Sequence, residues 1–127
     1  MEKVKKITAE QLRGANNAPS HRTVMWHGIA VTLRPLLSLV EVTQFVNSVM
    51  DSCYDKEHDV FVPDMMDFAF RVNAVSRYAC VELPESIEEQ YSILYNTDIF
   101  DTIVSYANAA QLQSIKDAIN VCMRNST

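Results

Sequence analysis

Glycine is scarce in this sequence. Gly14 and Gly28 are the only two glycines among 127 residues. Glycine-rich phosphate-binding loops and the regularly spaced tight turns of all-β folds both need glycine, because other residues adopt positive φ angles only at a steric cost. The composition therefore excludes such nucleotide-binding loops and argues against an all-β protein.

Long hydrophobic runs are also lacking. The apolar stretch of residues 29–42 is interrupted by Arg34, Pro35 and Ser38, whereas a membrane-spanning helix needs about 18 consecutive apolar residues. Residues 1–14 are basic but lack the apolar core and the small residues of a secretory signal. We therefore expect a soluble, cytoplasmic protein that does not bind membranes.

The sequence lacks paired cysteines. Cys53, Cys80 and Cys122 are odd in number, widely spaced and surrounded by apolar residues in helix-like patterns. This arrangement favours reduced cysteines within the core over a disulfide framework.

Motifs typical of catalysis or metal binding are missing too. No Cys-x-x-Cys pair, no two histidines four residues apart and no Gly-x-Ser-x-Gly elbow occur. Asp55, Glu57 and Asp59 resemble the start of a calcium-binding loop, but Val60 and Met66 stand where such a loop requires Gly and a bidentate Glu. We therefore expect a protein that is not an enzyme and that binds no cofactor and no metal.

Charge is present but unevenly distributed. Residues 1–22 hold five basic and two acidic residues, giving +3, so the remaining six basic and 14 acidic residues give −8. An acidic body disfavours nucleic-acid binding, which needs clustered Lys and Arg. Residues 1–21 are predicted to form a flexible basic arm. Two interpretations of this arm stay open: a solvated, mobile terminus, and a segment that orders on a partner.

Residues 22–127 are predicted to fold as one domain that opens with a β-hairpin. Two short β-prone runs, residues 23–26 and 29–33, flank His27 and Gly28, and Gly supplies the positive φ of a tight turn. Because an isolated hairpin is only marginally stable, it must pack on the helical body or pair with strands elsewhere.

Helical spacing of apolar residues predicts about five helices after the hairpin. They cover residues 39–53, 63–80, 84–95, 97–106 and 108–122. The fold class is therefore mainly α: a compact bundle of about five helices with a small N-terminal β-hairpin and a flexible N-terminal arm.

Capping residues mark the starts of these helices. Ser38 with Glu41, and Asn108 with Gln111, have the spacing of N-terminal caps, while Pro63 and Pro84 suit a first helical turn. In the third helix the expected apolar stripe consists of Ile87, Tyr91, Leu94 and Tyr95.

The hairpin and the segment after it carry a family resemblance. Residues 24–38 read VMWHGIAVTLRPLLS and continue into the predicted helix 39–53. This pattern resembles the opening of tail assembly chaperones and related small proteins from tailed-phage morphogenesis modules. Residues 84–95 and 108–122 look like proteins of Firmicutes phages or prophages, so the resemblance covers residues 22–124 as a pattern.

The resemblance implies a function in virion morphogenesis. A chaperone of this kind would bind the tape measure protein or tail tube subunits transiently in the host bacterial cytoplasm, without catalytic residues. It would use a partner surface around Trp26, Arg34 and Leu37. For Trp26 the alternative is a packing role that anchors the hairpin on the bundle.

Other functions stay open. The chain could be a head-tail connector that remains in the virion, or a phage-encoded inhibitor of a host defence enzyme whose acidic surface imitates nucleic-acid charge. A small enzyme is the least favoured alternative. Self-association into a homo-oligomer is also open, because a short domain rich in apolar residues can leave a patch to share.

Overall fold

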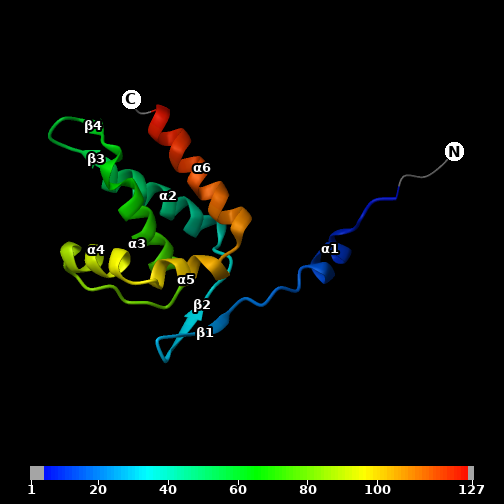
Figure 1. Cartoon of the computed structure of the whole chain (residues 1–127). Coiled ribbons are helices and arrows are strands. Elements are labelled where there is room, and N and C mark those ends of the chain that lie inside the picture. The colour runs from blue at the N-terminus through cyan, green and yellow to red at the C-terminus, as the bar shows by residue number, and fades with distance from the viewer. Residues whose placement is uncertain (1–4, 126–127) are drawn as a thin grey trace.

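The computed structural model describes residues 5–125, so the predicted arm is described from Lys5 onward. Figure 1 shows a helical body, a small hairpin below it and an arm that runs away from both. The body contains α2 (Leu39–Cys53), α3 (Met66–Tyr78), α4 (Ile87–Asn96), α5 (Ile99–Tyr106) and α6 (Ala109–Asn125). The mainly helical class is therefore confirmed.

The predicted number of helices is wrong by one. Residues 5–125 contain six α-helices, and the additional one is α1 (Ala9–Ala15) in the arm. The side chain of Thr8 accepts a hydrogen bond from the backbone of Gln11, and the Gln11 side chain accepts one from the backbone of Thr8. This reciprocal cap satisfies two backbone donors of the first turn, and it turns a weakly helical run into a short helix.

The predicted hairpin is present and pairs with a further segment. Strands β1 (Arg22–Trp26) and β2 (Ile29–Leu33) are antiparallel, and His27 and Gly28 between them have φ angles of 48° and 79°. Positive φ at both central residues matches a turn whose twist suits a hairpin. The end of β2 also bridges to Ala79 just after α3. This pairing attaches the hairpin to the bundle.

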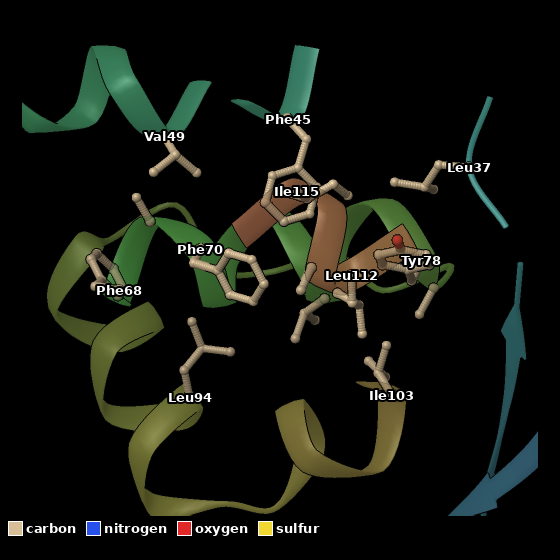
Figure 2. Packing of buried hydrophobic residues seen from close by; sticks show 14 of the residues in the cluster. Leu37, Phe45, Val49, Phe68, Phe70, Tyr78, Leu94, Ile103, Leu112 and Ile115 are labelled. Atoms are coloured by element: carbon tan, nitrogen blue, oxygen red, sulfur yellow. The ribbon is translucent and has the colours of Figure 1, made fainter. Parts of the chain in front are cut away.

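The core lies between α2, α3 and α6, with α4 and α5 closing one side. Phe45 of α2 is fully buried, and its ring centroid lies 5.2 Å from that of Phe70 in α3. Figure 2 shows these two rings near Ile115 of α6, with Leu94 of α4 and Ile103 of α5 approaching from the other side. Five helices thus bury one shared apolar interior.

Two of the predicted helix starts are confirmed and two are displaced. Ser38 forms the expected capping box with Glu41 at the start of α2, and the Asn108 side chain accepts from the Gln111 backbone N–H at 2.9 Å in α6. After Pro63 a turn of 3-10 helix, Pro63–Met65, precedes α3. Helix α4 begins at Ile87 instead of Pro84, because the hydroxyl of Ser86 accepts from the Glu89 backbone N–H and caps it there.

The prediction of three core cysteines holds only for Cys53. Its thiol is fully buried, whereas Cys80 is exposed and Cys122 is half-buried. Helix α3 ends at Tyr78 instead of residue 80, and Ala79 takes an extended conformation to bridge β2. Because alternate residues of an extended segment point in opposite directions, the residue after buried Ala79 faces solvent.

The stretch that resembles a calcium loop is a small second hairpin. Strands β3 (Tyr54–Asp55) and β4 (Val60–Phe61) pair across a four-residue turn. The Asp55 carboxylate accepts hydrogen bonds from the backbone N–H groups of Glu57 and His58, at 3.0 and 3.3 Å. The Asp55 carboxylate therefore stabilises a turn, as short polar side chains commonly do.

Candidate protein-binding surface

The three residues expected to form a partner surface lie in different environments. Trp26 and Arg34 are half-buried, and Leu37 is only 3% exposed. Leu37 belongs to the same buried core cluster as Tyr78 and Leu112, all labelled in Figure 2, while its neighbour Leu36 is 60% exposed. The structure therefore does not bring Trp26, Arg34 and Leu37 together on one exposed surface.

Trp26 anchors the hairpin tip to the α4–α5 connection. Its indole Nε1 donates to Asp98 Oδ1 at 2.8 Å, and His27 Nε2 lies 3.3 Å from the same oxygen. The two bonds, led by that of the indole, lower the pKa of the Asp98 carboxyl. A shallow cleft of about 520 Å³ lies beside Trp26 and is also lined by Asn96 and Thr97. The indole N–H already has its partner, so Trp26 mainly fixes the hairpin in place.

Arg34 is held by interactions within the chain. Its guanidinium binds both carboxylate oxygens of Glu41, and one of its nitrogens also donates to the backbone oxygen of Arg77 at 3.0 Å. The hydrogen bonds from Arg34 lower the pKa of Glu41 to about 2, and those to Glu41 raise the pKa of Arg34. Arg34 therefore ties the end of β2 to the start of α2.

A different exposed surface lies on α4. Ile87, Tyr91 and Tyr95 are 63%, 53% and 40% exposed, and their spacing of four residues places them along one side of the helix. Leu94 is the member of the predicted stripe that is buried, at 1% exposed. Of the predicted apolar stripe only Leu94 is therefore part of the core, and the other three residues face solvent.

The two tyrosines of α4 are held in position by α3. The Tyr91 ring centroid lies 5.6 Å from that of Phe68 and 4.6 Å from that of Tyr95. The Tyr95 hydroxyl donates to the Asp67 carboxylate, and the Arg71 guanidinium lies 4.5 Å from the Tyr95 ring centroid. Burial and the bond to Asp67 raise the pKa of Tyr95 to about 12. These contacts fix two aromatic rings that remain open to solvent.

The sequence in and around α4 is acidic. Residues 78–115 contain no Lys, Arg or His, but they contain six acids: Glu82, Glu85, Glu88, Glu89, Asp98 and Asp101. Glu85, Glu88 and Glu89 are exposed at and just before the first turn of α4. We name Ile87, Tyr91 and Tyr95 together with these three glutamates the α4 face.

The α4 face borders an apolar groove between α3 and α6. Asp67, which accepts from the Tyr95 hydroxyl, also lines this groove with Met66, Phe70 and Lys116. The groove has a volume of about 190 Å³, and the Lys116 ammonium lies 5.5 Å from the Phe70 ring centroid. Asp67 therefore links Tyr95 of the α4 face to this groove.

The sequence contained a signal for this face that the periodicity of α4 concealed. Apolar residues of an amphipathic helix are ordinarily assigned to the core, and Ile87, Tyr91 and Tyr95 fit that pattern. The run of 38 residues, 78–115, without a basic side chain is visible in the sequence. This lack of basic residues, together with tyrosines, which are common at protein interfaces, was the feature of the sequence that indicated a binding surface.

Across residues 5–125, no three His, Cys, Asp or Glu side chains gather as they would around a metal ion. None of the helices in this part of the chain has the length and apolar composition needed to cross a membrane. No protein-family model, curated protein or solved structure matches the chain.

Proposed function

We propose that this protein is a non-catalytic binding module that holds a basic, amphipathic segment of another protein on the α4 face. The observation that carries this proposal is the exposure of Ile87, Tyr91 and Tyr95 on one side of a helix whose first turn is acidic. Exposed apolar side chains in such a row would gain free energy by being covered.

The chemistry of the α4 face defines its partner. Tyrosine is enriched among residues that dominate binding energy at protein interfaces, because its ring buries a large area with few rotatable bonds. Tyr91 and Tyr95 already have fixed neighbours, so little conformational freedom remains to be lost on binding. The glutamates favour a partner with Lys or Arg beside its apolar residues.

The resemblance to tail assembly chaperones supplies the specific form of the proposal. In this form the partner is the tape measure protein or a tail tube subunit, bound in the cytoplasm of the host bacterium before it enters the virion. A helical, basic segment of such a protein would lie along α4 with its apolar side on the tyrosines.

Affinity capture from cells producing the phage that encodes the chain tests the proposal. Tagged wild type is compared with Tyr91→Ala and with the double variant Glu88→Lys/Glu89→Lys. Replacement of an aromatic contact residue by Ala should weaken partner binding about tenfold or more. The matched control is Asp51→Lys/Glu57→Lys, which changes the net charge equally at exposed positions outside α4.

The proposal is supported if wild type and control capture tape measure or tube protein and the α4 variants do not. Purified virions should then lack the chain. The chain's presence in virions would favour a connector instead. A host defence enzyme as the dominant partner would favour an inhibitor. Equal capture by wild type and both α4 variants would refute a role for the α4 face.

A further inference from the structure

Residues 5–20 of the N-terminal arm bury no side chain against the body. Every residue from 5 to 21 is exposed, and α1 buries none of its side chains. Ile7 is 72% exposed and Leu12 is 59% exposed. Helices shorter than about 12 residues are marginal in water unless they pack against something. The seven-residue α1 therefore lacks the contacts that would hold it as a helix.

The arm complements the α4 face in charge and in polarity. It carries Lys5, Lys6 and Arg13 against Glu10, whereas the α4 face carries glutamates. Ile7 and Leu12, the large aliphatic residues among residues 5–21, are exposed and match the exposed apolar row of that face. A basic amphipathic segment is the kind of partner that the proposed function requires, and this chain contains one.

The arm and helix α4 of one chain lie on opposite sides of the body. In Figure 1 the arm leaves the start of β1 and runs to the right, while α4 lies at the far left. An arm with this direction meets the α4 face of a neighbouring copy more readily than its own. A contact of this type is head-to-tail, so it builds chains or rings unless two arms are exchanged reciprocally.

We propose that the arm of one copy binds the α4 face of a second copy and thereby covers the partner site. This inference rests on the proposed function, because it assigns a second occupant to the same face. Self-association and partner binding then exclude each other. Release of the arm exposes the tyrosines for the partner.

Sedimentation equilibrium of the full-length protein over a concentration series tests the self-association. Wild type should form dimers or longer species. The arm variant Lys5→Glu/Lys6→Glu should raise the dissociation constant about tenfold, the equivalent of a few exposed charge pairs. The face variant Glu88→Lys/Glu89→Lys should do the same, and the control Asp51→Lys/Glu57→Lys should associate like wild type.

A mixture of the two charge-reversed variants identifies the contact directly. The acidic arm of one variant should bind the basic face of the other, so an equimolar mixture should associate more tightly than either variant alone. The arm variants change only residues outside the folded body, so they test the contact without a risk to folding. A monomeric wild type at all concentrations, or no recovery in the mixture, would overturn the inference.

The two proposals fail in different ways. If the arm covers the α4 face, the arm variant loses self-association but captures at least as much partner as wild type. If wild type and the arm variant are equally monomeric while the face variant loses the partner, only the second-copy inference fails. If the mixture of charge-reversed variants restores association but the α4 variants capture as much partner as wild type, only the proposed function fails.

Discussion

Gln111 connects the loop before α2 to the bundle, and its replacement should be costly. Its Oε1 accepts from the Tyr78 hydroxyl at 2.8 Å and from the Leu37 backbone N–H at 2.9 Å. Its Nε2 donates to the Leu37 backbone oxygen at 3.0 Å. Tyr78 is 1% exposed, and burial raises its pKa to about 12. The substitution Gln111→Leu removes all three bonds while keeping a side chain of similar size.

The cost follows from the buried groups that lose their partner. A buried hydroxyl left without a hydrogen bond costs about 1–3 kcal/mol, and each backbone bond contributes about 1 kcal/mol net. With the hydroxyl at the lower end of its range and two backbone bonds, the sum predicts that Gln111→Leu lowers the free energy of unfolding by about 3 kcal/mol. For a domain of roughly 100 residues this corresponds to a fall in melting temperature of about 12 °C.

Urea unfolding followed by circular dichroism measures this effect. Gln113→Leu is the matched control, because Gln113 is exposed on the same helix and its side chain donates to the Asp117 carboxylate at 3.0 Å on the surface. Its effect should stay within about 0.5 kcal/mol. Adding Tyr78→Phe to Gln111→Leu should recover about 1 kcal/mol, since it removes the unpaired hydroxyl. Equal costs at positions 111 and 113, or strict additivity with Tyr78→Phe, would refute the reasoning.

Three further outcomes are expected. The pKa of Glu41 is about 2 in the folded chain against 4.5 ordinarily, so the stability that it contributes is complete above pH 4.5 and is lost as the pH falls toward 2. Urea titrations across this window should show a smaller loss for Glu41→Gln than for wild type; parallel losses would contradict this. A thiol reagent should modify exposed Cys80 in the native protein but buried Cys53 only after unfolding. Mass spectrometry of the digested protein distinguishes the two cysteines. Rapid labelling of Cys53 in the native protein would contradict its burial in the core. Deletion of residues 1–20 should leave the melting temperature of dilute protein nearly unchanged, because residues 5–20 are all exposed; a loss of several degrees in calorimetry would make the arm part of the fold.

Local chemistry made much of the fold predictable. The Ser38 and Asn108 caps lie where their side chains can accept from the next turn, and the His27–Gly28 turn follows from its need for positive φ. Each of these features depends on interactions within a few residues. They can therefore be predicted from the sequence without knowledge of the tertiary structure.

The errors arose where a distant segment competes with a local pattern. Apolar periodicity continued the second predicted helix to residue 80, but pairing of Ala79 with Leu33 ends α3 at Tyr78 and exposes Cys80. The prediction of a flexible arm over residues 1–21 missed α1, which Thr8 and Gln11 cap. The periodicity of apolar residues gives no information about the hydrogen bonds that end α3 or begin α1.

The candidate surface depends most strongly on tertiary structure. Ile87, Tyr91 and Tyr95 have the spacing of core residues, and only the packing of α4 through Leu94 leaves them exposed. Leu37, adjacent to exposed Leu36, is buried because Gln111 binds its backbone from 74 positions away. The sequence by itself determined the helical class, the hairpin and the separation of a basic arm from an acidic body, because composition and short-range hydrogen bonding decide them. Which apolar residues remain available to a partner was decided by the tertiary structure, because a helix can bury only the side that its neighbours cover.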